Sequence, residues 1–278
     1  MAAPPGAPAA TPTAAAVGPI PQRVGNEPAP KVGASELIVV DGESGAVLLE
    51  QSAHRHVAPA STTKIITALV ALQRNDPAEV VTASYDPSEL VDSTLMWLQV
   101  GDRITLEDLL YGLMLPSGND AALAIATHVG GSRQRFVDLM NETTAELGLV
   151  DSHWVNPHGL DAPGHYSSAY DMVQFARAGM RDPRFRALSA ARAHTVRAGA
   201  RTYDVFNLNR LLGQVPGADG VKIGYTDDAG RTIVASATRN GHRVYVGAFH
   251  STDLVADCKP LFEWAFKSFA WPTPVKPG

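Results

Sequence analysis

Hydrophobic positions change their spacing along this chain, and the change divides it into strand-like ends and a helix-like middle. Short apolar runs stand at residues 37–40 and 46–50 near one end, and at 230–238 and 243–249 near the other. Between them, apolar residues recur at the three- and four-residue intervals that are typical of helices. We therefore expect strands at both ends and helices between them.

Turn-forming residues join the apolar runs at each end into hairpins. Asp41-Gly-Glu-Ser-Gly45 separates the first pair of runs, and Arg239-Asn-Gly-His242 separates the second. Asn-Gly between two alternating runs is the strongest short-range signal for a β-hairpin. The pattern predicts one antiparallel sheet to which both ends of the chain contribute.

The middle of the chain predicts a helical lobe inserted into an α/β domain. The expected helices are 62–72, 105–115, 119–129, 133–147, 169–181 and 257–269. The first is apolar nearly all the way round, so we expect it to be buried. Thr105, with Asp108 three residues later, resembles a capping box. The domain would consist of residues 35–83 and 205–271, with an all-helical lobe over residues 84–204 between them.

The first 34 residues differ in composition from the rest of the chain. They hold eight of the 20 prolines and ten alanines. Such a segment buries too little apolar surface to offset the entropy lost on ordering it, so we expect a tether over residues 1–34. A short tail, 272–278, would follow the domain. The tether lacks the basic start and the apolar run of a signal peptide. Because Pro-rich tethers often link an export signal or anchor to a folded domain, we expect a longer natural precursor.

Composition and charge exclude several classes of partner. The 278 residues carry 23 basic and 28 acidic side chains, a net charge of −5. Without clustered basic residues, nucleic acid is disfavoured as the main partner. No stretch of about 18 apolar residues is present, so we expect no membrane span. Cys258, the single cysteine, allows no intramolecular disulfide and is expected to be buried in a helix.

The sharpest candidate for chemistry is Ser61-Thr-Thr-Lys64, at the start of the first expected helix. Residues three apart share a helix face, so the Lys64 amine can reach the Ser61 hydroxyl. Serine needs a base to become a nucleophile, and lysine serves as one only where burial or a nearby cation lowers its pKa. The helix start would also favour a developing oxyanion at Ser61. The alternative is that Ser61 simply caps the helix.

Two further short motifs strengthen this candidate. Ser117-Gly-Asn119 lies between two expected helices, and Lys222-Ile-Gly224 precedes an expected strand. Taken singly, the first would be a capped loop and the second a surface lysine that enters a turn. All three motifs in this order arise by chance far more rarely than any one of them.

Together the motifs resemble the active-site triplet of the penicillin-recognising serine enzymes. Within that group the chain is similar to the serine-type D-alanyl-D-alanine carboxypeptidases, the low-molecular-mass penicillin-binding proteins, over about residues 35–270. The resemblance implies a β-lactamase/transpeptidase-like fold, with the active site between the sheet and the helical lobe. The stretches that carry it are Pro59-Ala-Ser-Thr-Thr-Lys64, Leu115-Pro-Ser-Gly-Asn-Asp-Ala-Ala122, Asn156-Pro-His-Gly-Leu-Asp161, Gly164-His-Tyr-Ser167, Gly220-Val-Lys-Ile-Gly-Tyr-Thr226 and Ala229-Gly230.

The resemblance implies an acyl-enzyme mechanism on a peptidoglycan stem peptide that ends in D-Ala-D-Ala. Ser61 would attack the carbonyl between the two D-alanines, and Lys64 would take its proton. Ser117 would pass that proton to the leaving amine, while Lys222 holds the local charge. Asn119 would orient Lys64 and the substrate amide.

The resemblance also implies the residues that surround the substrate. Backbone N–H groups of Ser61 and Tyr225 would form the oxyanion hole, and Ile223, Gly224 and Thr226 would contact the substrate. β-Lactams would acylate the same serine. The family implies no cofactor and no metal.

One position departs from the family pattern. Where Ile223 stands, the family usually has a threonine or serine whose hydroxyl helps to bind the terminal carboxylate. Related enzymes often place an arginine on the same carboxylate, and residues 252–255 offer none. An unmet buried oxygen costs of order 1–3 kcal/mol. We therefore expect weakened carboxylate recognition, with Thr226 or Arg231 as candidates to compensate.

Other functions explain less of the sequence. A class A-like β-lactamase needs a glutamate between the second and third motifs, and the nearest, Glu146, lacks the asparagine which that family places after the following leucine. A weakened binding or regulatory protein on the same fold has Ile223 as its only support. An unrelated cytosolic hydrolase would require the density of motifs to be accidental.

Three residues of one loop raise the alternative of a metal site. Zinc D-alanyl dipeptidases use His and Asp ligands, and His158, Asp161 and His165 lie close together in the sequence. They fall in a Gly/Pro-rich loop without a helical His-x-x-x-His spacing. Hydrogen bonding within the loop is the favoured interpretation.

A peptidoglycan substrate implies an extracytoplasmic location, periplasmic or on the cell-wall side. Many carboxypeptidases carry a C-terminal β-rich domain and an amphipathic anchor, which have no counterpart after residue 271. Any membrane attachment is therefore expected on the N-terminal side.

Overall fold

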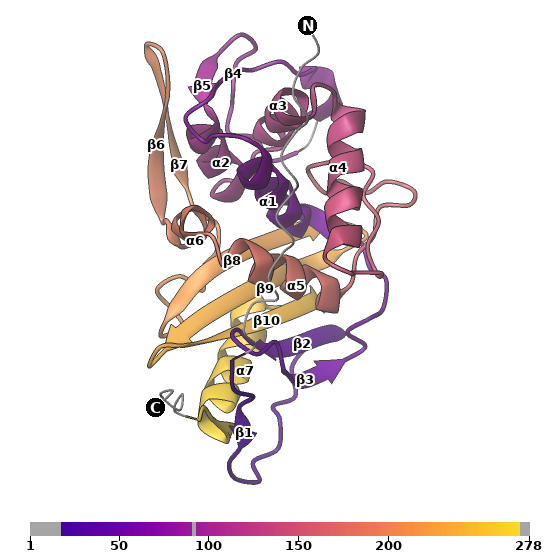
Figure 1. Cartoon of the computed structure of the whole chain (residues 1–278), viewed down its shortest axis with the longest axis vertical. Helices are drawn as coiled ribbons and strands as arrows, with labels where there is room; N and C mark the ends of the chain where they lie inside the picture. The colour runs from indigo at the N-terminus through magenta and orange to yellow at the C-terminus, as the bar shows by residue number, and fades with distance from the viewer. Residues whose placement is uncertain (1–17, 91–92, 273–278) are drawn as a thin grey trace, which may run out of the picture.

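A five-stranded antiparallel sheet runs through the centre of the molecule (Figure 1). The computed structural model describes residues 18–90 and 93–272. The strand order is β3–β2–β10–β9–β8, so both ends of the chain build the sheet, as the hairpin signals predict. Its strands are β2 (Glu36–Asp41), β3 (Val47–Gln51), β8 (Ala218–Thr226), β9 (Gly230–Arg239) and β10 (His242–Ser251).

Helices cover both faces of the sheet, because its central strands are apolar on both sides. In β2, Ile38 and Val40 join the core on the helical side, whereas Leu37 and Val39 join the core on the opposite side. α7 packs on β9 and β10 from that opposite side, and α5 packs on β2 and β10 from the helical side (Figure 1). These helices are α5 (Ala169–Gly179) and α7 (Leu254–Ser268).

The part of the expected tether that the structure describes is paired and packed. β1 (Gln22–Arg23) pairs with β11 (Phe269–Ala270), directly after α7. The indole N–H of Trp264 donates to the Glu27 carbonyl oxygen at 3.3 Å. The composition of residues 18–34 did not predict these contacts, since the segment contributes mostly backbone groups to them. The start of the tether and the tail lie outside the described residues.

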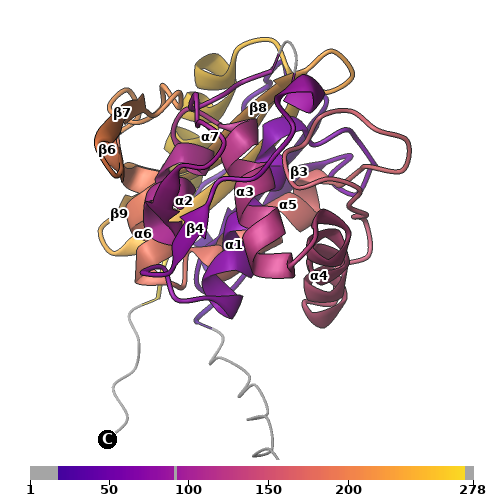
Figure 2. The same cartoon turned by 90° about the horizontal axis from the view of Figure 1, so that it is seen from above.

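The lobe beside the sheet contains most of the expected helices (Figure 2). Its helices are α1 (Lys64–Arg74), α2 (Leu106–Met114), α3 (Asn119–Gly130), α4 (Arg133–Glu146) and α6 (Pro183–Ala190), with short 3₁₀ turns η1 (Ala60–Thr63) and η2 (Pro87–Leu90). α1 is the buried helix that the pattern predicts. The Asp108 N–H donates to Thr105 Oγ1, which caps α2 as expected. None of the helices described is both long and apolar enough to cross a bilayer.

The lobe is not all-helical, which corrects the prediction. It also carries two short hairpins, made of β4 (Val80–Thr82) with β5 (Arg103–Thr105) and of β6 (Ala193–Ala198) with β7 (Arg201–Phe206). Their strands are short and only partly buried, so they lack the apolar alternation that reveals a strand in a sequence. α6 was missed because only three of its eight residues are buried.

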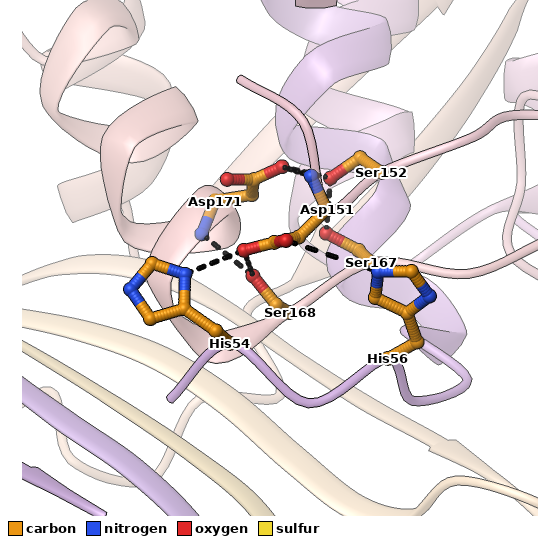
Figure 3. A network of polar contacts seen from close by, with 7 residues as sticks. All are labelled: His54, His56, Asp151, Ser152, Ser167, Ser168 and Asp171. Atoms are coloured by element: carbon orange, nitrogen blue, oxygen red, sulfur yellow. Dashed lines mark hydrogen bonds and ion pairs between the residues drawn. The ribbon is translucent and has the colours of Figure 1, made fainter. Parts of the chain in front are cut away.

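A loop between α4 and α5 wraps around the segment that leads into η1. Near its start, Asp151 lies between His54 and His56, which belong to the segment before η1 (Figure 3). His54 Nδ1 lies 2.6 Å from Asp151 Oδ2, and Ser168 Oγ donates to the same oxygen at 3.3 Å. Asp171, in α5, accepts the Asp151 N–H at 2.9 Å. Polar contacts therefore fix both ends of the loop.

His165 holds the same loop against η1. The Val155 N–H donates to its Nδ1 at 3.1 Å, so Nε2 carries the proton and donates to Thr63 Oγ1, also at 3.1 Å. Burial, together with the nearby His153, lowers the pKa of His165 to about 4. Gly159 has φ +92°, and a Cβ there would lie 1.9 Å from the Ala60 carbonyl oxygen. Only glycine lets the loop approach this closely.

The buried His165 predicts a loss of stability in mild acid. Its pKa is lowered on folding from 6.5 to about 4. The unfolded chain therefore binds a proton that the folded chain refuses as the pH falls below 6.5. Between pH 7.5 and 5 this histidine should remove about 2 kcal/mol from the free energy of unfolding. Urea titrations of wild type and His165→Gln at the two pH values measure it, because the variant lacks this share of the slope.

Thr63→Val is the matched control for that experiment. It removes the hydrogen-bond partner but keeps the buried imidazole, so it should keep the pH slope of the wild type. Equal slopes for His165→Gln and wild type would show that His165 titrates normally in the folded chain.

Candidate active site

A direct hydrogen bond joins the two residues of the first motif, with Lys64 Nζ 2.9 Å from Ser61 Oγ. Ser61 lies in η1, and Lys64 is the first residue of α1. A 3₁₀ helix has three residues per turn, so side chains i and i+3 stand directly above one another. Ser61 does not cap α1, whose N-cap position is Thr63. The contact therefore comes from the tight turn before the helix.

Lys64 is fully buried and has three oxygen neighbours. Besides Ser61, its Nζ lies 2.6 Å from Asn119 Oδ1 and 2.8 Å from the His158 carbonyl oxygen. Those two oxygens can only accept hydrogen bonds. A neutral Lys64 amine would therefore donate to both and turn its lone pair toward the Ser61 hydroxyl. This is the arrangement that a general base requires.

Burial and a second lysine favour the neutral form of Lys64. Desolvation lowers its pKa well below the ordinary value, the charge of Lys222 lowers it further, and Asp120 partly opposes them. Lys222 is itself buried, which lowers its pKa to about 7. Two buried ammonium groups repel each other, so the pair tends to hold fewer than two charges.

Ser117 presents a hydroxyl without a partner. Its Oγ is buried and makes no hydrogen bond to any residue that the structure describes. Lys222 Nζ instead donates to the Ile223 carbonyl oxygen at 3.2 Å. The expected role of Lys222, to hold the local charge beside Ser117, therefore involves no direct hydrogen bond between them. A buried hydroxyl without a partner is unfavourable, so Ser117 is placed to meet an incoming group.

One cavity of about 590 Å³ brings the motifs together. Its floor is β8, the last strand in the sheet order, so the outer edge of β8 is free to pair with an extended peptide. A Cβ at Gly224 would lie 2.8 Å from the Ser61 nitrogen, and glycine therefore allows β8 to pass beside the Ser61 N–H. Predicted site residues that line the cavity are Ser61, Ser117, Asn119, Ile223, Gly224, Tyr225 and Thr226.

Thr226 and Arg231, the two residues expected to compensate for the missing hydroxyl at Ile223, differ in how firmly their donors are engaged. The Thr226 hydroxyl donates to Asp161 Oδ1 at 2.8 Å, so its proton is already engaged. Arg231, which pairs with Tyr225 across β8 and β9, lines the cavity and donates weakly to the Thr252 carbonyl oxygen at 3.4 Å. Arg231 is the one charged side chain in the described lining of the cavity.

The loop residues that raised a metal alternative make hydrogen bonds within the protein. His158 Nδ1 accepts the Leu160 N–H at 3.2 Å, and burial lowers the pKa of His158 to about 3. Asp161 accepts from Thr226, and His165 bonds Thr63. In the described residues no cluster of three His, Cys, Asp or Glu has a metal-binding arrangement.

The glutamate that a class A-like β-lactamase would need is remote from Ser61. Glu146 is the last residue of α4 and is largely exposed. Its Oε1 lies 4.0 Å from Nη2 of Arg74. No carboxylate side chain belongs to the described lining of the cavity. This geometry favours a carboxypeptidase-like site.

Sequence reasoning missed Asp120, which shapes one wall of the cavity. Its buried carboxylate accepts the N–H groups of Met96 and Leu98 at 3.1 and 2.9 Å. Thr94 on the same segment donates from Oγ1 to the Ser117 carbonyl oxygen at 2.7 Å. The signal was an acid directly after Asn119, but its partners lie more than 20 residues away and leave no local pattern.

Comparisons with known proteins agree with this geometry. A family model described as D-alanyl-D-alanine carboxypeptidase, peptidase S11, matches residues 23–251. D-alanyl-D-alanine carboxypeptidase DacC of Escherichia coli is 36% identical over 264 residues, which cover 90% of this chain and 65% of that protein. The chain thus spans less than two thirds of this relative's length.

Two further similarities cover the other protein almost completely. D-alanyl-D-alanine carboxypeptidase DacB2 of Mycobacterium tuberculosis is 35% identical, over 88% of this chain and 86% of its own. The crystal structure of the Streptomyces K15 DD-transpeptidase matches with a TM-score of 0.81 and 31% identity, over 87% of this chain and 100% of that one. These matches confirm the family and the fold that the three motifs predict: the chain belongs to the peptidase S11 family, the D-alanyl-D-alanine carboxypeptidases.

Proposed function

We propose that this chain is a serine D,D-carboxypeptidase that removes the terminal D-alanine from peptidoglycan stem peptides. The observation that carries the proposal is the buried Lys64 amine, 2.9 Å from the Ser61 hydroxyl and held by Asn119 and the His158 carbonyl. A serine hydroxyl that is hydrogen-bonded to a desolvated lysine amine is an activated nucleophile. Family membership supplies the substrate class.

In the first step, neutral Lys64 accepts the Ser61 proton while Ser61 Oγ attacks the carbonyl between the two D-alanines. Backbone N–H groups of Ser61 and Tyr225, where β8 passes beside η1, receive the developing oxyanion. Loss of one such donor typically lowers the rate about 10²–10³-fold. The substrate would lie along the free edge of β8 as an added strand.

In the second half of that step, the leaving amine needs a proton. Ser117 offers a buried hydroxyl that bonds to no residue the structure describes, and Lys222, on β8, has a pKa lowered to about 7. The proton taken by Lys64 would reach the amine through Ser117, and the Lys222 cation would stabilise the arrangement. Water then hydrolyses the acyl-enzyme.

The same serine would react with β-lactams, which present a carbonyl in the same position. The resulting acyl-enzyme would hydrolyse slowly. A peptidoglycan substrate places the enzyme outside the cytoplasm, on the periplasmic or cell-wall side. The acyl-enzyme also admits a second activity beside hydrolysis: the structural match to the Streptomyces K15 DD-transpeptidase supports transfer of the acyl group to an amine as a side reaction.

Benzylpenicillin provides the direct test of the acyl-enzyme. Intact-mass spectrometry of the wild type should show one covalent penicilloyl adduct per chain, because Ser61 lies beside an activated lysine. Ser61→Ala should show none. D-alanine release from a stem pentapeptide should be lost in the same variant.

Ser93→Ala is the matched control, because it removes another serine hydroxyl that lines the same cavity. It should form the adduct. Rapid penicillin turnover without an adduct would instead indicate a β-lactamase, and an adduct in Ser61→Ala would move the nucleophile elsewhere.

The lowered pKa of Lys222 predicts an alkaline limb in the pH profile of acylation. If the Lys222 cation is required, it is present below about pH 7 and is lost as the pH rises through that value. The second-order rate constant for penicillin should then fall by up to about tenfold per pH unit above 7. Stopped-flow acylation across pH 5.5–9.5, a range of about four units, measures it.

Lys222→Arg keeps the cation at every pH in that range. The variant should be slower at pH 6, but its profile should lack the alkaline limb. A limb that persists unchanged in Lys222→Arg would assign the titration to another group.

A further inference from the structure

A second hollow adjoins the Ser61 cavity at the edge of β8. It is larger, about 710 Å³ against about 590 Å³. Leu208, Ile223, Arg231 and Leu254 line both, so a ligand that fills the first can continue past these side chains into the second. The site is therefore open at this end.

The hollow lies at the end of the cavity where the leaving group would sit. Ile223 directly follows Lys222, and the Leu208 N–H donates to the Leu115 carbonyl oxygen at 3.2 Å, two residues before Ser117. In the proposed mechanism, Lys222 and Ser117 serve the leaving amine. A group that extends from that amine past Ile223 would enter the second hollow.

The floor of the hollow is apolar and its walls are cationic. Leu208, Ile223 and Leu254 supply an aliphatic surface, and the Leu208 side chain is 46% exposed. Arg210 and Lys259 stand beyond it, and Lys259 also interacts electrostatically with Glu263, four residues further along α7.

One acid, Asp253, also lines the hollow and offsets only part of this positive charge. Asp253 is the N-cap of α7, where its Oδ1 accepts the N–H groups of Val255 and Ala256 at 2.9 and 3.0 Å. Together with Arg231, the lining holds three cations against this one engaged carboxylate. The hollow thus carries a net positive charge over an aliphatic floor.

We propose that this hollow is a leaving-group subsite for amino acids whose aliphatic side chain ends in a carboxylate. The inference rests on the proposed function and extends it to a second activity, cleavage of D-alanyl bonds to acidic residues. The amide C–N bond breaks, the Ser61 ester forms, and the Ser61 proton passes to the leaving nitrogen. Water then splits the ester. Binding of the remote carboxylate by Arg210 and Lys259 lowers the barrier only for the larger leaving group.

Three peptides with one acyl part test the subsite. Each ends in D-alanine joined to D-alanine, D-glutamine or D-glutamate, and release of the last residue is followed by mass spectrometry. D-glutamine matches D-glutamate in shape and lacks only the side-chain charge. The wild type should release D-glutamate with a kcat/KM about tenfold above that of D-glutamine, as two exposed cations acting together allow.

The double variant Arg210→Gln/Lys259→Gln should bring that ratio close to one. Its kcat/KM for D-alanine release should stay within about twofold of wild type, since neither residue lines the Ser61 cavity. Arg103→Gln/Lys31→Gln is the matched control, because it removes two exposed charges outside both hollows. It should keep the tenfold preference.

The outcomes separate the subsite from the function on which it rests. Release of D-alanine by the wild type without a preference for D-glutamate overturns the subsite alone. A preference that survives the double variant overturns the assignment to Arg210 and Lys259. Absence of any release, D-alanine included, overturns the proposed function and the subsite with it.

Discussion

The site depends on keeping an ammonium group out of water. Lys64 is fully buried, and desolvation is the largest cause of its lowered pKa. A charged lysine would be poorly stabilised there, since its neighbours Asn119 and the His158 carbonyl are dipoles and not charges. The surrounding fold is arranged around that requirement. The 3₁₀ turn η1 places Ser61 above Lys64, α3 positions the Asn119 amide, and the loop after α4 positions the His158 carbonyl.

The loop after α4 makes this burial possible. It must cross directly over η1, and Gly159 alone allows its backbone to approach the Ala60 carbonyl. His165 then joins the loop to Thr63 as a neutral donor, because the Val155 N–H fixes which ring nitrogen holds the proton. A protonated His165 would add a like charge near His153 and lose the Val155 bond. Burial and this hydrogen bond therefore both favour the neutral state of His165.

Much of the fold and the site could be predicted because their signals are local. The hairpin at Asn240-Gly241, the buried α1 and the cap at Thr105 follow from spacing and turn chemistry over a few residues. The 3₁₀ turn at Ser61 could not be predicted, because tertiary contacts with β8 and the loop decide between 3₁₀ and α. Asp120 and residues 18–34 were missed for a related reason: Asp120 binds backbone groups distant in the sequence, and residues 18–34 contribute backbone groups to distant partners, so neither leaves a local side-chain pattern.

Ile223 connects the chemistry of the site to its shape. On β8 it alternates with Lys222 and Gly224, so it belongs to the core on the α7 side, yet the free edge of the strand also exposes it to the Ser61 cavity. A hydroxyl here would give a substrate carboxylate a fixed partner at the strand edge. The isoleucine instead continues an aliphatic surface through Leu208 and Leu254 toward Arg210 and Lys259. Ile223 thus has two effects. It removes the hydroxyl that would bind the substrate carboxylate, and it continues the apolar surface toward more distant cations. Such a site would accept a wider range of leaving groups and would be less selective for the terminal D-alanine carboxylate.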